Sequence, residues 1–237
     1  MAEQYDRYRP TSPDALLDRL AALRPADVLD VACGTGKTAA ALAARGLRVL
    51  GVELDPRMAR VASAHGVTVE ISPFETWPDA GRRFDLITCT SGWHWIDPQR
   101  GLRKAAELLR PGGVIARFWN YYRLDESTQA ALAEVYRRHA PGTRPHASGA
   151  RNGAPPVDPF ATDAAFNGVE RALYRWDQVF TADEWAGLVA TYSDHQQLAP
   201  ERLAALQAAV RDLIQARGGT LHAQGECHLL LSHRTAA

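Results

Sequence analysis

The chain has 237 residues, 46% hydrophobic and 23% charged, which is enough to bury the core of one α/β domain. Lysine plus arginine and aspartate plus glutamate each number 27, so composition argues against an electrostatic hold on nucleic acid or an anionic membrane. Three cysteines (Cys33, Cys89 and Cys227) form no C-x-x-C pair, which argues against a cysteine zinc site or a disulfide scaffold.

The first residues, Met1 to Arg7, are polar and lack the apolar core of a signal peptide. No segment of the sequence approaches 18 apolar residues, the length that a membrane-spanning helix needs. We therefore expect a cytoplasmic protein.

Apolar runs of strand length alternate with segments of helical periodicity over the first half of the chain. A helix is expected to begin at residues 12–14, where a serine, a proline and an aspartate follow one another. The predicted strands are 27–31, 47–52, 67–71, 84–90 and 113–119, and the further helices are 38–45, 56–64 and 98–109. This alternation predicts right-handed β-α-β units in a parallel sheet.

The pattern changes after residue 120. A helix over 125–139 precedes a long segment, 140–168, which is rich in proline and glycine and has the character of a lid or a mobile loop. Strand-like alternation returns over 169–180, and Thr181 with Glu184 forms a capping box for the next helix. A long amphipathic helix over 200–217 and a strand over 220–232 complete the chain.

The turn after the first strand carries the strongest chemical signal. Asp30 is near the end of an apolar run, Gly34 and Gly36 follow in a tight turn, and Glu53 ends the next apolar run. Glycines let the backbone approach a ligand closely, and the second acid can accept hydrogen bonds from two ribose hydroxyls. This layout is typical of a nucleotide-type ligand site at the first strand-to-helix turn of a parallel sheet.

Three ligands could use such a turn. A phosphate-binding P-loop would need a glycine at position 31, where Val31 stands. A dinucleotide fits the G-x-G-x-x-A pattern of residues 34–39, but the carboxylate of Asp30 would face its pyrophosphate. S-adenosylmethionine (SAM) has an ammonium, a sulfonium and a ribose but no phosphate, so Asp30 and Glu53 suit it better than NAD.

Four segments in order resemble the motifs of class I SAM-dependent methyltransferases. They are D-V-A-C-G-T-G at 30–36, G-V-E-L-D at 51–55, F-D-L-I-T-C-T-S-G-W-H-W-I-D at 84–97 and E-L-L-R-P-G-G-V-I-A at 107–116. The resemblance covers about residues 5–120 and is greatest to small-molecule enzymes that include trans-aconitate and ubiquinone/menaquinone-type methyltransferases. It implies a doubly wound, mostly parallel seven-stranded sheet that ends in an antiparallel hairpin.

The resemblance also implies a division of labour within a single domain, residues 1–237. Residues 1–120 would form the SAM-binding half, residues 121–168 a variable substrate or lid segment, and residues 169–237 the part that completes the sheet. The cofactor-binding residues would be Tyr5, Arg9, Asp30, Ala32, Gly34, Gly36, Glu53, Leu54, Phe74, Glu75 and Ser91. Among them Arg9 would bind the SAM carboxylate, and Leu54 and the segment from Phe74 would hold the adenine.

The implied reaction is methyl transfer from SAM to an O, N or C nucleophile of a small molecule, with S-adenosylhomocysteine as the product. His94 is the candidate general base, because neutral imidazole can take a proton near pH 7, and a structural or cofactor-positioning role stays open. Trp93, Tyr121 and Tyr122 are candidate substrate residues.

No metal, nucleic acid or membrane partner is expected, and the sequence does not indicate the oligomeric state. A specialised metabolite is the first expectation for the acceptor and a small carboxylic acid the second. The latter would need pocket arginines, for which Arg117, Arg123, Arg144 and Arg151 are candidates. Two further alternatives stay open: a SAM-binding enzyme that does not transfer methyl groups, and an NAD-dependent oxidoreductase.

Overall fold

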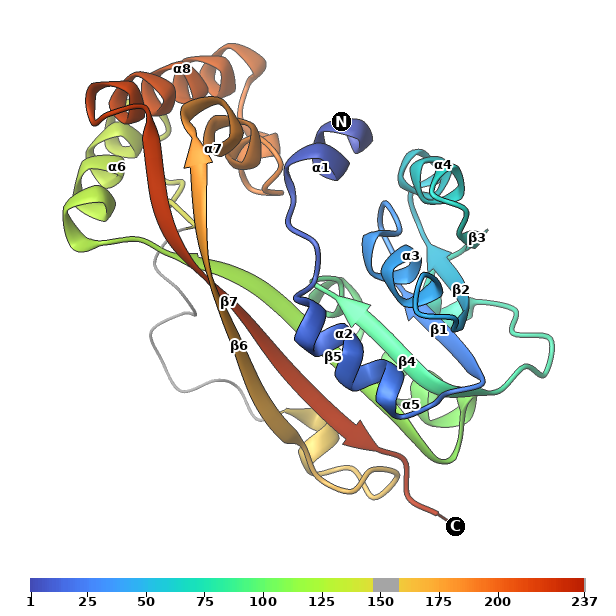
Figure 1. The fold of residues 1–237 in the computed structure, drawn as a ribbon. Coiled ribbons are helices and arrows are strands. Elements are labelled where there is room, and N and C mark those ends of the chain that lie inside the picture. Colours follow the sequence, from blue (N-terminus) through green and yellow to red (C-terminus); the bar gives the residue numbers. More distant parts are fainter. Residues whose placement is uncertain (147–157, 237) are drawn as a thin grey trace.

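A computed structural model describes residues 1–146 and 158–236 of the chain. Within these residues one seven-stranded sheet has the strand order β3-β2-β1-β4-β5-β7-β6 (Figure 1). Strands β1 to β5 run parallel to one another, and β7 is antiparallel to both β5 and β6. The predicted fold, a mostly parallel sheet with an antiparallel C-terminal pair, is confirmed.

We call residues 1–120, for which the sequence predicts cofactor binding, the cofactor half, and its strands lie close to their predicted positions. Strands β1 (Asp27–Val31) and β4 (Phe84–Thr90) have the predicted ends, β2 (Arg48–Glu53) is shifted by one residue, and β3 (Thr68–Ile71) begins one residue later than predicted. The main helices of this half are α2 (Asp14–Ala22), α3 (Lys37–Ala43), α4 (Pro56–Ala64) and α5 (Pro98–Leu108). Local apolar periodicity therefore predicted this half well, since each element is a buried strand or a helix with one apolar face.

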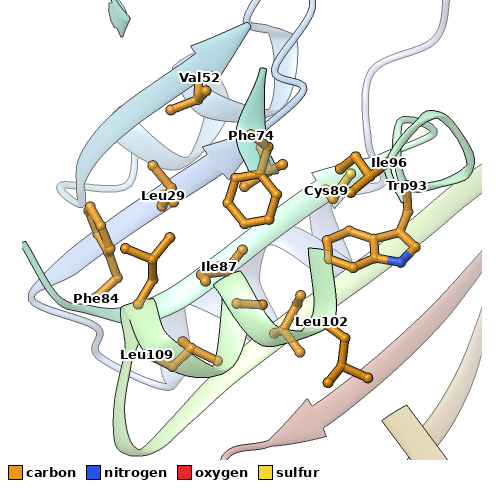
Figure 2. Close-up of a cluster of buried hydrophobic side chains, with 14 of the residues drawn as sticks. Leu29, Val52, Phe74, Phe84, Ile87, Cys89, Trp93, Ile96, Leu102 and Leu109 are labelled. Atoms are coloured by element: carbon orange, nitrogen blue, oxygen red, sulfur yellow. The ribbon is translucent and has the colours of Figure 1, made fainter. Parts of the chain in front are cut away.

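Helices pack on both faces of the sheet, as the alternation of side chains along each strand requires. On one face, Leu16 and Leu20 of α2 belong to a buried cluster with Val28, Leu86 and Phe118. On the other face, α5 contributes to a cluster with the next residues along the same strands (Figure 2). The members of that cluster from α5, β1, β4 and β5 are Leu102, Ala105, Leu108, Leu29, Val31, Phe84, Ile87, Cys89, Leu109 and Ile115.

Strand β5 is much longer than the sequence predicts, whereas the bounds of β6 and β7 lie within one residue of the predicted ones. Strand β5 (Leu109–Arg123) pairs with β7 (Thr220–His233) as far as Arg123 opposite Gln224, and β6 (Glu170–Thr181) pairs with the whole of β7 except its last two residues. The prediction ended this strand at residue 119, four residues before its observed end, because polar residues follow. Those residues still pair, because each backbone group finds a partner across the ladder.

The far ends of these long strands carry a separate group of helices, which we call the helical lobe. It consists of α6 (Glu126–His139), α7 (Ala182–Val189) and α8 (Pro200–Ala216), which gather at one end of β6 and β7 (Figure 1). The lobe has its own buried cluster, which includes Tyr122, Trp185 and Leu206. The predicted capping box is confirmed at the start of α7, where Thr181 and Glu184 bond to each other's backbone.

The N-terminal residues form a helix that the sequence analysis missed, α1 (Ala2–Tyr8). It lies between the helical lobe and α4 (Figure 1). Glu3 pairs with Arg60 of α4, and Asp6 lies 2.9 Å from His65 Nε2, while the ring of Tyr8 packs on Gly187 of α7. Tertiary contacts with both neighbours therefore support a helix that is too short to be stable alone.

A buried ion pair fixes the chain where it re-enters the described structure at Asp158. The guanidinium of Arg117 on β5 donates to both carboxylate oxygens of Asp158, at 3.0 and 2.7 Å, and both side chains are almost wholly buried. The same guanidinium lies 3.9 Å from the ring centroid of Phe160. Arg117 is therefore committed to this pair and is not a pocket arginine.

Within the described part of the chain, no helix is long and apolar enough to cross a membrane.

The buried pair leads to a stability prediction. Asp158→Asn removes the charge that compensates buried Arg117, so we expect the free energy of unfolding to fall by about 3–5 kcal/mol in urea titrations. Glu134→Gln is the matched control, because Glu134 pairs with Arg137 and Arg138 on the exposed face of α6 and should cause no measurable change. Equal losses in the two variants would contradict this assignment.

Candidate active site

The glycine turn between β1 and α3 forms the floor of the site. Gly34 and Gly36 both have positive φ, +57° and +79°, a conformation that favours glycine. A Cβ placed on Gly34 would meet nothing within 4 Å, whereas one on Gly36 would lie 2.7 Å from Ala62 Cβ of α4. The two glycines thus do different work: Gly34 opens the turn to a ligand, and Gly36 lets α3 begin close to α4.

Glu53, at the end of β2, holds this turn in place. Its Oε2 accepts a hydrogen bond from the backbone N–H of Gly34 at 2.8 Å, and its Oε1 accepts one from the N–H of Asp55 at 2.9 Å. The side chain is 9% exposed. Each carboxylate oxygen can accept a further hydrogen bond, so Glu53 keeps the capacity to bind a diol at the mouth of the turn.

Asp30, on β1, lies beneath the turn and is 1% exposed. Its Oδ1 accepts from the Thr88 hydroxyl of β4 at 2.7 Å, while its Oδ2 has no hydrogen-bond partner within the described residues. Burial, together with the nearby charge of Glu53, raises the pKa of Asp30 to about 7. Two carboxyl groups thus share one small volume, which disfavours an anion there and favours a cation.

The turns that follow β1 and β4 lie against each other. Ala32 and Ser91 both adopt positive φ, near 50° and 56°, which is uncommon for residues other than glycine. Gly92, where the two turns meet, has no room for a side chain, because a Cβ there would lie 2.6 Å from Ala32 Cβ. This close approach brings Ser91 beside the glycine turn at the carboxyl ends of the strands, where doubly wound sheets bind ligands.

A pocket opens at this junction and collects five of the predicted cofactor residues, Tyr5, Arg9, Ala32, Gly34 and Ser91. Sequence reasoning missed the remaining lining residues, which are Pro10, Cys33, Thr35, Lys37, Thr38, Thr90 and Asn120. Thr38 Oγ1 lies 2.8 Å from Thr90 Oγ1 and 3.0 Å from Ser12 Oγ, so hydroxyl groups bridge α3 to β4. The sequence did hold a signal for two of them, because Thr38 lies in the first turn of a predicted helix and Thr90 at the end of a predicted strand.

The predicted adenine-side residues divide into two groups. Leu54, directly after Glu53, is 64% exposed. It therefore offers an apolar surface that a planar ligand could cover. Phe74 is buried and stacks at a tilt on Trp93, with ring centroids 6.2 Å apart. Glu75 Oε1 accepts from the backbone N–H of Asp97 at 3.0 Å, which ties this segment to the start of α5.

Arg9 reaches the pocket from the segment after α1. Its Nε donates to Thr191 Oγ1 at 2.8 Å, its Nη2 donates to the Thr191 carbonyl at 3.1 Å, and its guanidinium lies 4.2 Å from the ring centroid of Tyr192. Arg9 therefore connects the pocket to the helical lobe.

The predicted catalytic and substrate residues are not brought together. Trp93 is 7% exposed and packs edge-on to Phe160 in the core, and Tyr122 is 3% exposed inside the helical lobe (Figure 2 for Trp93). Tyr121 lies on the opposite face of β5 from Tyr122 and contacts His228 edge-on, with ring centroids 5.4 Å apart. Of these candidate residues only His94 is exposed. It lies just after the turn that holds Ser91, next to the exposed Trp95.

His94 is the accessible titratable group nearest in sequence to Ser91. Its ring centroid lies 4.8 Å from that of Trp95, and partial loss of hydration lowers the pKa of His94 from its ordinary value. The ring is therefore predominantly neutral at pH 7, the form that can accept a proton.

The residues present fit SAM on the grounds of this structure alone. The unpartnered oxygen of Asp30 suits a ligand cation, Glu53 suits a ribose, and the open space above Gly34 lets a ligand lie on the turn. Two buried carboxyl groups under the turn oppose a pyrophosphate, which disfavours NAD.

Comparison with known proteins agrees with this geometry. Residues 28–113 match the model of a family described as "Methyltransferase domain". An uncharacterized methyltransferase of Mycobacterium tuberculosis is 29% identical over 191 residues, which cover 80% of this chain and 73% of that protein. A ubiquinone biosynthesis O-methyltransferase of Coxiella burnetii is 35% identical over 100 residues, covering 39% of this chain and 43% of that one.

Among solved structures, a candidate type II methyltransferase from Anaeromyxobacter dehalogenans is similar in fold. It has a TM-score of 0.67 at 24% identity, over 97% of this chain and 100% of that chain. The long final strands and the helical lobe therefore belong to a fold that a second protein shares over its whole length.

The different roles of the two glycines give a paired prediction. Gly36→Ala combines left-handed strain with a clash on α4, so we expect a loss of about 2–5 kcal/mol in unfolding free energy. Gly34→Ala should cost only about 1–2 kcal/mol, because it meets strain without a clash. Its methyl group should weaken SAM binding in calorimetric titration. A larger stability loss for Gly34→Ala than for Gly36→Ala would refute this division.

The raised pKa of Asp30 predicts a pH dependence. Its ionised form attracts the SAM ammonium, so we expect affinity to rise about tenfold between pH 6 and pH 8, and this rise to be absent in Asp30→Asn. Without ligand the sign is reversed: the raised pKa stabilises the fold while Asp30 is protonated, and this contribution is lost as the pH rises from about 4 through 7. Calorimetry and urea unfolding measure the two effects, and identical pH profiles for wild type and Asp30→Asn would exclude this role.

Proposed function

Because this chain is a SAM-dependent methyltransferase, we propose that it methylates an O, N or C nucleophile of a small molecule, for which a specialised metabolite is the favoured class. The observation that carries the cofactor side is the pair of acids beneath the glycine turn, with one oxygen of Asp30 left without a partner among the described residues. The neutral net charge supports a small acceptor over a nucleic acid.

We assign the binding of SAM to the predicted cofactor residues. Asp30 would interact with the ammonium, Glu53 would accept from the ribose hydroxyls, and Leu54 would cover the adenine, with Phe74 and Glu75 supporting the adenine edge. When bound, SAM would supply an activated methyl group on a sulfonium. Ala32, Gly34, Gly36 and Ser91 would shape the turn beneath it, and Tyr5 and Arg9 would close the pocket from the N-terminal side.

Catalysis then depends chiefly on positioning and on exclusion of water, because the methyl donor is already activated. The chain contributes a rigid floor, made of two tight turns in contact, and a side wall held by Arg9. His94 is exposed in the short helical turn that follows β4 and Ser91, and we assign to it the acceptance of a proton from the attacking nucleophile.

The acceptor side is assigned to residues 121–168 within a single catalytic domain of residues 1–237. This segment starts at the end of β5, next to Asn120 of the pocket, and Tyr121 is its first side chain. A small carboxylic acid is the second candidate class. Arg117 is unavailable for it, and Arg123 pairs with Glu226 at 3.4 Å, which leaves Arg144 among the described candidates; Arg151 lies outside the described residues.

The cofactor assignment is tested by calorimetric titration of SAM, S-adenosylhomocysteine and NAD into wild type and Glu53→Gln. The amide keeps the side-chain volume but has only one acceptor oxygen, so it loses one of the two bonds that Glu53 accepts from Gly34 and Asp55 as well as an acceptor for the ribose. We expect SAM affinity to fall about tenfold or more, while circular dichroism shows that the sheet and its helices stay folded. Glu107→Gln on the exposed surface of α5 is the control and should bind normally. Tighter binding of NAD than of SAM would overturn the assignment.

His94 gives a separate kinetic prediction, once release of S-adenosylhomocysteine has identified an acceptor. With His94 as base, kcat/KM rises with pH through a pKa below the ordinary histidine value and then levels off. His94→Gln should lower kcat about 100-fold or more and remove this inflection while SAM affinity stays the same. An unchanged pH profile in His94→Gln would leave His94 a positioning residue.

A further inference from the structure

A second cluster of titratable side chains lies in the helical lobe, outside the glycine turn. His146, Asp194 and His195 each present one potential ligand atom, and these atoms all lie within 4.8 Å of one another. His146 precedes the undescribed segment, whereas Asp194 and His195 belong to the start of a short helical turn, His195–Gln197. Residues separated by 48 positions in the sequence thus converge on one point.

The carboxylate of Asp194 lies between the two imidazole rings. His195 Nδ1 is 2.7 Å from Asp194 Oδ1, and His146 Nε2 is 2.8 Å from Asp194 Oδ2 and 3.0 Å from Oδ1. His195 is fully buried, while the side chains of His146 and Asp194 are 43% and 45% exposed. The cluster therefore has a rigid inner ligand and two outer ligands that solvent can reach.

The other nitrogen of His195 is also held. Nε2 lies 2.8 Å from the hydroxyl of Tyr136 on α6, in a buried contact. A hydroxyl can accept as well as donate, so Tyr136 can accept a hydrogen bond from a protonated Nε2 of His195, and in that tautomer Nδ1 has a free lone pair. Metal-binding histidines commonly have their second ring nitrogen fixed in this way.

The ring of His146 is oriented by stacking. It lies nearly parallel to the ring of Tyr192, with an interplanar angle of 12° and centroids 4.1 Å apart. Tyr192 also carries the guanidinium of Arg9 at 4.2 Å from its ring centroid. The cluster is thus one residue removed from the side wall of the SAM pocket.

We propose that His146 Nε2, Asp194 and His195 Nδ1 bind a divalent transition-metal cation of the Zn²⁺ class, with the remaining position open to water. Two imidazoles and one carboxylate are a known zinc-type donor set with three protein ligands. The contacts of 2.7 and 2.8 Å would widen by about half an ångström to surround a tetrahedral ion. The cysteine spacing argued only against a zinc site made of cysteines, whereas the donors here are histidine nitrogens and a carboxylate oxygen.

Binding needs no redox step and no further reactant. In the metal-free cluster each ring can donate an N–H to Asp194, and in the metal-bound cluster each ring carries its proton on the other nitrogen. The proton of His195 then points to Tyr136, and that of His146 points away from the ion. The ion would join residue 146 to the 194–195 turn, and through Tyr192 it would stiffen the wall that holds Arg9.

The test uses full-length protein without a histidine tag, stripped of metal with a chelator. We expect Zn²⁺ titration to give one ion per chain, and Co²⁺ to give the visible absorption of a tetrahedral nitrogen and oxygen site. His146→Ala and Asp194→Asn should abolish both signals. His222→Ala, which removes an exposed histidine of β7, is the matched control and should leave both unchanged.

Tyr136→Phe provides an independent arm, because it removes only the hydroxyl behind His195. We expect it to weaken Zn²⁺ binding about 10–100-fold without changing the stoichiometry. Absence of stoichiometric binding in the wild type, or equal binding in wild type, His146→Ala and Asp194→Asn, would overturn the proposal. The cluster would then be a hydrogen-bonded network of the lobe alone, while SAM binding measured on the same samples reports separately on the proposed function.

Discussion

The hydrogen bonds that Glu53 accepts from the backbone N–H groups of Gly34 and Asp55 determine the shape of the proposed cofactor site. They join the end of β2 to the turn after β1, so two neighbouring strands present one continuous ligand surface. Asp30 lies under the same turn with an oxygen that lacks a partner in the described residues. Such a concentration of negative charge is unfavourable by itself, and a cationic ligand relieves it. The fold thus accepts a local cost in stability at the point where we propose that SAM binds.

The helical lobe gives this surface its walls. The long ends of β5, β6 and β7 carry α6, α7 and α8 beyond the edge of the cofactor half, and α1 connects the two parts (Figure 1). Arg9 contributes to both, because it lines the pocket and bonds to Thr191. A chain of contacts thus leads from the cluster of His146, Asp194 and His195 through Tyr192 to Arg9 at the pocket.

Most of the cofactor half could be predicted from the sequence. Its strands and helices are short, regular and separated by turn residues. Asp30, Gly34 and Glu53 lie within one β-α-β unit, so their spacing in the sequence fixes their relative positions. Five predicted residues meet in the pocket as a result. The aromatic candidates were harder to place, because the sequence around Trp93 and Tyr122 does not distinguish an aromatic side chain that lines a site from one that packs in the core. Their packing against Phe160 and Trp185 appears only when distant segments meet.

The sequence by itself determined the fold class, the family resemblance and the residues of the glycine turn, because these depend on periodicity and on chemistry within about 25 residues. Only the tertiary structure decided which side chains stay available. It committed Arg117 to Asp158, attached Arg9 to Thr191, and brought Tyr136 and His146 to His195. Each of these contacts joins residues at least 41 positions apart, and such pairings follow from the packing of whole elements and leave no local pattern in the chain.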